Sequence, residues 1–233
     1  MRDFLRRLKY YGLGFTVGLI FVVFFMRNRS CSWSPENRVK TAIFERILVL
    51  SEENQKKRSA LKLSEKELIG AIQNGDINFG KSKKDNSFKA YYFTCETKNG
   101  TEFSCKVSMP KESYISEIMF TSQNAKKLKS TKSGAGKFIF FPKSKDFIYV
   151  DTTDLLLCQQ EKLNLMNVNK LFERIKKTGS FDFEKSRLNR SPKPEHWISF
   201  RGNNNELIST KSIWYKEKIK IISFEFPDSN SCK

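Results

Sequence analysis

Few residues in this chain are suited to acid–base chemistry. His196 is the only histidine among 233 residues, so it is the only imidazole available as a general base. It lies between Glu195 and Trp197, and no nucleophile neighbours it in the sequence. A single histidine also excludes the common multi-histidine zinc sites, and no metal or cofactor is expected. The sequence predicts that His196 is a structural or surface residue.

Two further motifs have the residue types of a site. Asp151 and Asp154 could act as an acid–base pair or bind a cation, but their spacing also fits a helix start, where carboxylates meet the helix dipole. Ser133 to Lys137 reads Ser-Gly-Ala-Gly-Lys and faintly suggests a phosphate loop. The Walker pattern needs a glycine at position 131 and Ser or Thr at 138, where Thr131 and Phe138 stand. We therefore expect no phosphate loop and interpret the aspartates as a helix start.

Residues 121–145 contain seven lysines and no acidic residue. Phosphates, either of nucleic acid or of anionic lipid, could bind here, and a solvated loop explains the composition equally. Nucleic-acid sites usually interleave aromatic residues with the cations, whereas Phe138, Phe140 and Phe141 follow the cluster. The candidate anion-binding patch consists of Lys126, Lys127, Lys129, Lys132 and Lys137.

The five cysteines are Cys31, Cys95, Cys105, Cys158 and Cys232. No two have the Cys-x-x-Cys spacing of zinc ribbons or thioredoxin-like motifs. Because the count is odd, a complete disulfide framework is not expected. We interpret the cysteines as scattered thiols of the core or the surface.

A strong basic excess and a membrane-length segment define the chain. Its formal net charge is +18, and its 13% aromatic content is typical of a folded protein. Residues 10–26 form a run of 17 uncharged residues, which as a helix covers about 25 Å. The sequence therefore predicts a single transmembrane helix. The charges that flank it are Arg2, Arg6, Arg7, Lys9, Arg27 and Arg29.

A cleaved signal peptide is the alternative interpretation, because a basic start and an apolar core are both present. An Ala-x-Ala-like cleavage site is missing, and Asn28, Arg29 and Ser30 do not fit a lipoprotein site at Cys31. We therefore expect an uncleaved anchor. The cations on its two sides nearly balance, and the cost of translocating a short tail with four of them favours a soluble part on the non-cytoplasmic side. Free thiols would favour the cytoplasm.

Gly14 and Gly18 form a G-x-x-x-G motif inside the predicted span. In a membrane helix this spacing permits close helix–helix packing, so a homodimer through the span is one interpretation. The other is that the glycines are merely tolerated, since glycine is common in such helices.

The soluble part alternates helix and strand signals. Ser34-Pro35 starts a helix with Val39, Ile43, Phe44 and Ile47 on one face, and a polar stretch follows at 51–59. Residues 64–67 form a capping box, and that helix ends at Asn74-Gly75, where the glycine is expected to take the left-handed conformation of a helix cap. A further helix is expected at 151–164. Residues 121–145 read as a linker or exposed hairpin, with short strands at 138–141 and 147–150.

The strands at 91–96 and 103–109 alternate apolar and polar residues around Asn99-Gly100. A two-residue turn would put their apolar sets on opposite faces, so we predict a three-residue loop with Gly100 in the left-handed conformation. Cys95 and Cys105 are then diagonal neighbours rather than a disulfide. In the last strand, 219–226, the apolar parity changes between Ile221 and Ile222, which predicts a β-bulge or a strand end.

The second half of the chain repeats the first. Residues 74–82 and 178–186 share four of nine positions, and 196–198 align with 91–93 one insertion later. Lys216-Glu217 aligns with Lys111-Glu112, and the strand from 219 aligns with the one from 115. Each repeat reads as a helix, a Gly-aromatic turn and about three antiparallel strands. The predicted α+β architecture is an anchor at 1–30, repeats at 31–120 and 151–233, and a Lys-rich linker with short strands at 121–150.

Three features carry a family resemblance: the basic start with its short glycine-containing span, Cys31-Ser32-Trp33 followed by Arg38-Val39, and the motif at 74–82 before a Tyr-rich strand. The chain resembles an uncharacterised family of small bacterial single-pass membrane proteins with a domain of unknown function. That domain looks distantly like the α+β fold of messenger-RNA-interferase toxins. Their relatives often carry a histidine on the first helix, where residues 39–46 have none. The resemblance implies a fold and an anchor, and no activity.

Three functions follow as hypotheses. The first is a membrane-anchored, non-enzymatic protein that interacts with the lipid bilayer and an unknown protein partner. The alternative is a membrane-tethered RNA-binding or ribonuclease-like domain that uses the basic surface for nucleic acid. An enzyme on the non-cytoplasmic side is the least supported of the three.

Overall fold

The computed structural model describes residues 2–84, 88–121, 131–142, 148–190, 192–215, 218–227 and 232. Within these ranges, the side chains of residues 2–6, 25–33 and 84 are not described. The chain divides into two compact units, residues 1–42 and 43–233, and each is described by itself.

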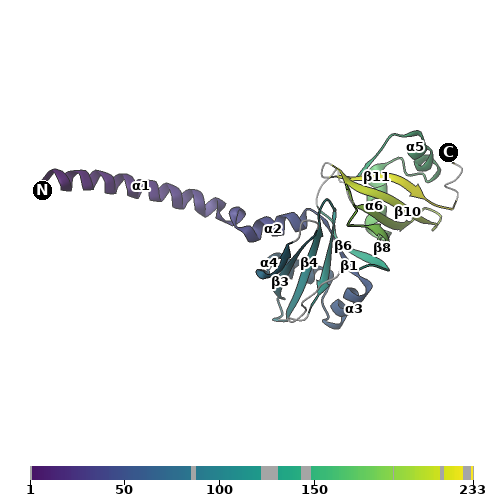
Figure 1. The fold of residues 1–233 in the computed structure, drawn as a ribbon, viewed down its shortest axis with the longest axis horizontal. Coiled ribbons are helices and arrows are strands. Elements are labelled where there is room, and N and C mark those ends of the chain that lie inside the picture. The colour runs from purple at the N-terminus through teal and green to yellow at the C-terminus, as the bar shows by residue number, and fades with distance from the viewer. Residues whose placement is uncertain are drawn as a thin grey trace. The chain divides into compact units, whose positions relative to one another are not determined.

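The N-terminal unit consists of helix α1 (Arg2–Trp33) and most of helix α2 (Pro35–Phe44) (Figure 1). Residues Arg7–Phe24 of α1 form a helix long and apolar enough to cross a membrane, a property that a signal sequence shares. None of this stretch is buried. Leu13, Phe15 and Phe24 are each about two-thirds exposed, so the described part of the chain leaves most of this apolar surface uncovered.

The globular unit is an α+β structure built on one mixed sheet of eleven strands among the described residues. Its helices are α3 (Glu52–Ala60), α4 (Glu65–Asn74), α5 (Asp154–Lys162) and α6 (Val168–Thr178). Its strands are β1 (Ile47–Ser51), β2 (Asp76–Lys84), β3 (Phe88–Glu96), β4 (Glu102–Pro110), β5 (Ile115–Phe120), β6 (Ala135–Phe140), β7 (Ile148–Val150), β8 (Ser180–Arg187), β9 (Glu195–Arg201), β10 (Leu207–Tyr215) and β11 (Lys218–Glu225).

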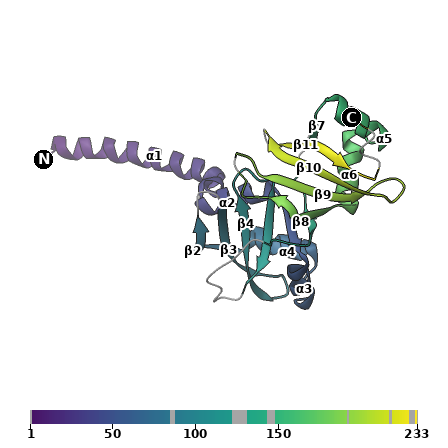
Figure 2. The ribbon, with the colours of Figure 1, turned by 45° about the vertical axis from the view of Figure 1, so that its right-hand side comes forward.

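The two halves of this unit have the same topology. The first half is β1-α3-α4-β2-β3-β4-β5 and the second is β7-α5-α6-β8-β9-β10-β11 (Figures 1 and 2). The sheet order is β2-β3-β4-β5-β1-β6-β8-β9-β10-β11-β7, so β6 joins the two halves at the centre. In each half the strand before the helices returns parallel to the last strand: Ile47 pairs with Ile115, and Ile148 with Ile219.

The predicted repeat therefore lacked two strands that each half contains. Each half has a meander of four strands instead of three, plus a parallel strand before its two helices. Ile47 belongs to this strand and not to the face of the preceding helix, and the polar stretch at 51–59 is largely helix α3. Parallel pairing joins residues far apart in the chain, so local periodicity does not reveal it.

The local structure repeats as well. Ser64 and Glu67 form the predicted capping box of α4, and Asn167 caps α6 through the amide of Lys170. Gly75 and Gly179 end α4 and α6 in extended conformations, which corrects the left-handed cap expected at Gly75. A Cβ at Gly75 would meet Cys95 Sγ at 2.8 Å, so close packing explains glycine there.

A polar motif bends the first meander strand of each half. Asn78 Oδ1 accepts a hydrogen bond from the amide of Lys81, and Ser82 Oγ accepts one from the amide of Tyr92. In the second half, Asp182 Oδ1 accepts from the amide of Lys185, and Ser186 Oγ accepts from the amide of Trp197. The register shifts at both places. These β-bulges lie in residues 74–82 and 178–186, the two segments that align with each other in the sequence.

The two parity arguments are confirmed. Glu96 pairs with Glu102, the amide of Thr97 bonds the carbonyl of Thr101, and Gly100 has φ +77°, so the loop has three residues. Cys95 and Cys105 are free, buried and diagonal in the register. In the last hairpin the register shifts so that Ile222 has no partner, which is the predicted bulge.

The helices of the two halves cover opposite faces of the sheet. The lateral order of the strands is the same in both halves, but β8 runs opposite to β2. A half-turn about an axis across the strands relates two such units, and it exchanges the faces. Consistently, Ile47 and Val49 belong to the core around α6, while Leu48 and Leu50 are buried outside that cluster. Strand β1 is buried on both faces, which explains its uninterrupted apolar run.

Part of the expected linker is a central strand. Residues 135–140 form β6, which pairs with β1 and with β8. A Cβ at Gly136 would lie 2.4 Å from Val49 and 2.7 Å from Phe183. The glycine that resembled part of a phosphate loop is therefore required by packing. The predicted domain bounds at 31, 121 and 151 stay predictions.

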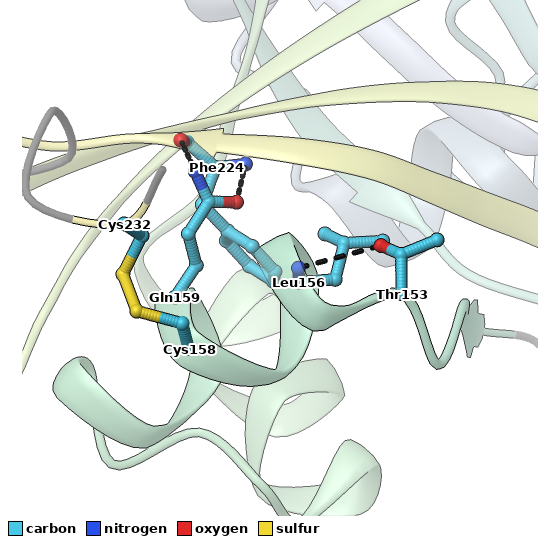
Figure 3. Close-up of a disulfide and its surroundings, with 6 residues drawn as sticks. All are labelled: Thr153, Leu156, Cys158, Gln159, Phe224 and Cys232. Carbon is cyan, nitrogen blue, oxygen red and sulfur yellow. Dashed lines mark hydrogen bonds between the residues drawn. A yellow bond between two sulfur atoms is a disulfide. The ribbon is translucent and has the colours of Figure 1, made fainter.

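The interpretation of all cysteines as scattered thiols was wrong for one pair. Cys158 of α5 forms a disulfide with Cys232, 74 residues later (Figure 3). Beside it, the side chain of Gln159 makes two hydrogen bonds with the backbone of Phe224. Gln159 Nε2 donates to the carbonyl of Phe224, and Gln159 Oε1 accepts from the backbone amide of Phe224. Thr153 caps α5 through the amide of Leu156. These contacts fix α5 and Cys232 to strand β11.

Candidate functional site

The predicted lysine patch is only partly described. Lys126, Lys127 and Lys129 lie outside the described residues. Lys132 is exposed, and Lys137 forms a 2.6 Å ion pair with Glu65 of α4. Because Lys137 already has an acidic partner, it is a weaker anion ligand than the sequence implied. The patch as a whole stays a prediction.

The predicted aspartate pair is split by the structure. Asp151 forms a 2.6 Å ion pair with Lys220, whose hydrogen bond lowers the pKa of Asp151 below its usual value. Asp154 lies in the first turn of α5, as a helix start requires. The interpretation of Asp154 as a helix-start residue is confirmed.

The structure describes the candidate residues of the membrane helix only in part. Arg7 and Lys9 are exposed on α1, and the side chains of Arg2, Arg6, Arg27 and Arg29 are outside the description. A Cβ at Gly14 or Gly18 would meet nothing within 4 Å. Helix packing through these two glycines stays a prediction.

His196 lies in a buried polar cluster between the two halves. The hydroxyl of Ser113, in the turn before β5, lies 2.8 Å from His196 Nε2. The ring of the adjacent Tyr114 lies over the imidazole, with 4.1 Å between centroids, and its hydroxyl is 2.6 Å from Ser212 Oγ. The structural role that the sequence predicted for His196 is thus confirmed.

The hydrogen bonds indicate which nitrogen of His196 is protonated. Nδ1 faces the carbonyl of Ser212 at 3.4 Å, and a carbonyl can only accept. Nδ1 therefore carries the proton, and Nε2 accepts from the hydroxyl of Ser113. Burial is the main cause that lowers the pKa of His196 to about 3, and the nearby charge of Arg46 lowers it further. The imidazole is neutral at physiological pH.

A serine hydroxyl bonded to an oriented imidazole is the arrangement that activates nucleophiles. In this protein the pair is sealed. Ser113, Tyr114, His196 and Ser212 are each at most 1% exposed, and Trp214 stacks on Tyr114. A substrate would have to open the contact between the halves to reach Ser113 Oγ. The arrangement therefore joins the two halves rather than presenting a reactive group.

The second half exposes a different cluster on the sheet face opposite α6. The cross-strand pairs Trp197–Lys211 and Lys220–Tyr149 lie on this face, together with Tyr215. Lys185 lies over Trp197 at 5.1 Å, and Lys220 lies 5.8 Å from the rings of both Tyr215 and Tyr149. We call this cluster the lysine–aromatic face; it consists of Tyr149, Lys185, Trp197, Lys211, Tyr215 and Lys220.

Acidic residues are placed among these cations. Glu195 pairs with Lys211 at 2.9 Å and with Arg190, and Lys185 pairs with Glu225 at 3.2 Å. Hydrogen bonds from Lys211 are the main cause that lowers the pKa of Glu195 below its usual value. The face therefore carries donors and ionised acceptors side by side, with aromatic rings between them. Tyr149 and Tyr215 are each about 40% exposed.

Sequence reasoning missed this face, although a signal was present. Alternation put Trp197 with Ser199 on the polar side of its strand, and Lys211 follows on the next strand. The register between β9 and β10 was needed to bring Lys211 opposite Trp197, and the parallel return of β7 was needed to add Tyr149.

No protein-family model, curated protein or solved structure matches this chain. The resemblance to the bacterial single-pass family and to the interferase-toxin fold stays a prediction, and the chain's own geometry is the basis for its function.

Proposed function

We propose that the protein is a single-pass membrane protein whose globular part binds a partner on the non-cytoplasmic side. The observation that carries this proposal is the exposed apolar helix at Arg7–Phe24. About 18 helical residues cover roughly 27 Å, close to the thickness of a bilayer core. A water-exposed helix of this composition would be strongly unfavourable, so a bilayer is its natural surrounding.

The disulfide supports the placement of the globular part on the non-cytoplasmic side of the membrane. Disulfides persist in oxidising compartments and are rare in the cytosol. The disulfide between Cys158 and Cys232 therefore favours a globular part outside the cytoplasm. The cost of translocating the four N-terminal cations favours the same side. An RNA-binding role, the alternative function, requires contact with the cytoplasm and is disfavoured by the same pair.

Two observations support binding over catalysis. The only imidazole is sealed between the halves with both nitrogens engaged, and the exposed cluster consists of lysines over aromatic rings. We also infer that residues 47–120 and 148–225 are two copies of one unit, because their topology and bulges match.

Topology tests the proposal. We would fuse either alkaline phosphatase, which is active only outside the cytoplasm, or β-galactosidase, which is active only inside, to the C-terminus. The expected result is phosphatase activity in the membrane fraction and no β-galactosidase activity. A control that replaces Arg2, Arg6, Arg7 and Lys9 by Ser should reduce the phosphatase signal, since these cations orient the span. Activity of β-galactosidase alone in the native fusion would overturn the proposed side.

A further inference from the structure

Strand β2 lies at one end of the sheet, whereas its counterpart in the second half is covered on both sides. The sheet order places β2 next to β3 only (Figure 2). Strand β8, the equivalent of β2, lies between β9 and β6. Within the described residues, no strand takes the place of β6 beside β2. The outer side of β2 is therefore the position that an added strand would fill.

The strand registers define which residues of the two edges are equivalent. Ile77 of β2 and Phe181 of β8 occupy the same place in the register with the next strand of the meander. The sequence alignment of the two segments gives the same correspondence, and it matches Phe79 with Phe183. The covered edge of β8 can therefore be compared with β2 residue by residue.

Strand β6 covers the edge of β8 with backbone hydrogen bonds. The amide of Phe183 donates to the carbonyl of Gly134 at 3.1 Å. Gly136 pairs with Phe181 two residues further along the same antiparallel ladder. Pairs that exchange hydrogen bonds alternate along such a ladder, so the backbone groups of Phe181 point toward β6. By equivalence, the backbone N–H and C=O of Ile77 point outward from the edge of β2.

The exposure of one aromatic ring shows the difference that β6 makes. Phe183 is 4% exposed, and a Cβ at Gly136 would lie 2.7 Å from its ring. Phe79, its equivalent, is 39% exposed, although its ring contacts that of Tyr91 with 6.5 Å between centroids. The β2 edge thus presents an apolar ring where the second half has a covering strand, and such a ring gives an added strand a side-chain contact.

The charges near β2 determine the kind of strand that fits. Lys81 and Lys83 of β2 and Lys89 of β3 are exposed, and none of them forms an ion pair in the part of the chain that the structure describes. The equivalent of Lys81 is Lys185, which is paired with Glu225. Lysines on an edge strand discourage pairing with another basic chain, and a second copy of this protein has a formal net charge of +18. The strand that fits is therefore acidic.

We propose that the β2 edge binds an acidic segment of a partner protein, which adds to the sheet as a strand antiparallel to β2. Backbone hydrogen bonds to Ile77 provide affinity, while Phe79 and the lysines of β2 select the side chains of the segment. The proposal rests on the binding role proposed above and deepens it, because it names the site and the class of partner.

Strand β6 also indicates the order of side chains in the bound segment. In β6, Phe138 follows two residues after Gly136, and a Cβ at Gly179 would meet its ring at 3.0 Å. The first half has Gly75 at the same place, the end of α4. An antiparallel segment faces the lysines of β2 with the residues that precede its small residue. The expected order is therefore acidic residues, then a small residue and, two positions later, an apolar one.

The test measures the binding of a fluorescent peptide to the full chain in detergent micelles by anisotropy. The probe is Glu-Asp-Glu-Ala-Gly-Thr-Phe-Ile with blocked ends. In a second peptide, N-methylglycine replaces glycine and removes the amide that faces β2. We expect this peptide to bind at least about fivefold more weakly than the probe. A peptide with lysine in place of the three acidic residues should not bind measurably.

Variants of the protein separate the edge from its net charge. K81Q/K83Q removes two cations of β2, and the control K170Q/K177Q removes two exposed cations of α6, so both proteins have the same net charge. We expect K81Q/K83Q to weaken binding of the probe by about fivefold and the control by less than about twofold. F79A should weaken binding by about threefold or more, with folding checked by its unfolding transition.

Hydrogen exchange locates the bound peptide, because the amide of Ile77 should exchange more slowly when the probe is present. Equal losses of binding in the two double variants would show attraction to net charge alone and overturn the proposal. So would a complete lack of probe binding, equal binding of the N-methylglycine peptide, or unchanged exchange at β2. A dimer of the free chain that F79A dissociates would also overturn it, since a second copy would then occupy the edge.

The peptide experiment and the reporter fusions give independent results. Binding is measured in micelles, where the side of the membrane on which the globular part lies has no effect. Failure of this proposal and failure of the proposed topology are therefore distinguishable.

Discussion

Ser113 Oγ lies 2.8 Å from His196 Nε2, although 83 residues separate the two in the chain. Ser113 comes from the turn between β4 and β5 of the first half, and His196 from β9 of the second. The ring of Tyr114 also lies against the imidazole of His196 and belongs to the hydrophobic core of the second half, so these contacts join the two halves. Because this buried cluster contains residues of both halves, we expect the two halves to unfold together in one transition.

The buried imidazole predicts a pH dependence. In the folded protein the pKa of His196 is lowered from 6.5 to about 3. At a pH between these two values, His196 is therefore protonated in the unfolded chain and neutral in the folded one. Stability from this residue is complete above pH 6.5 and falls as the pH decreases. We expect the free energy of unfolding to drop by about 2 kcal/mol between pH 7.5 and pH 5. Denaturant titrations at several pH values measure it.

Carboxylates such as Asp151 and Glu195, with their lowered pKa values, contribute stability above their ordinary pKa near 4 and lose it only at lower pH. The window from pH 7.5 to 5 therefore reports on the histidine. His196→Gln should be less stable than the wild type near pH 7.5, where the native hydrogen bonds of His196 are intact, and should lose most of the slope. A variant that keeps the native slope would show that another group causes it.

Tyr114→Phe removes the hydroxyl that lies 2.6 Å from Ser212 Oγ and leaves the stacked ring in place. Burial raises the pKa of Tyr114 well above its usual value, so the wild-type hydroxyl is protonated. We expect a loss of about 1–2 kcal/mol in the free energy of unfolding, the cost of a broken buried hydrogen bond. Tyr149→Phe on the exposed face is the matched control and should change stability by less than about 0.5 kcal/mol. Equal losses of stability in Tyr114→Phe and Tyr149→Phe would contradict a stabilising role for the buried cluster.

Gly136→Ala tests the central position of β6. The new methyl group would meet Val49 and Phe183 at distances that no packed side chain tolerates, so we expect a loss of about 1–3 kcal/mol. Gly70→Ala, inside α4 with open space around it, should instead stabilise the protein by about 0.5–1 kcal/mol. Thermal or denaturant unfolding compares the two. A harmless Gly136→Ala would contradict the pairing of β6 between β1 and β8.

Much of the local structure could be predicted from the sequence because it depends on neighbours in the chain. The capping box at Ser64, the three-residue loop at Gly100 and the bulge at Ile222 each follow from spacing and parity. The alignment of segments 74–82 and 178–186 predicted that the two halves repeat each other there, and the structure adds a β-bulge in each segment that the alignment did not predict.

What could not be predicted depends on contacts between distant segments. The parallel returns of β1 and β7, and the insertion of β6 between the halves, have no local signature. The same holds for the contact of Ser113 with His196 and for the disulfide, whose cysteines are 74 residues apart. An odd number of cysteines argues against a complete framework but leaves a single bridge open.

The disulfide predicts selective thiol reactivity. In the native protein without reductant, Cys158 and Cys232 should resist alkylation because their sulfurs are bonded, and Cys95 and Cys105 because they are buried. Denaturation alone should expose Cys95 and Cys105, while Cys158 and Cys232 should react only after reduction. Peptide mass spectrometry after differential alkylation separates these cases. Alkylation of Cys158 in the denatured, unreduced protein would contradict the bridge.

Removing the bridge with Cys158→Ala/Cys232→Ala should lower the free energy of unfolding by about 2–4 kcal/mol, because the unfolded chain regains the freedom of a long loop. Cys95→Ala changes a buried thiol without breaking a bond and is the control, with an expected loss of about 1 kcal/mol. The hydrogen bonds between Gln159 and Phe224 remain in both variants.

The central claim is that the apolar helix at Arg7–Phe24 holds the protein in a membrane. Alkaline extraction of the membrane fraction, followed by the intact mass of the retained protein, tests it most directly. We predict that the chain stays in the pellet and that its mass includes residues 1–26. A protein released into the soluble fraction, or one shortened to a start beyond Met26, would contradict the claim.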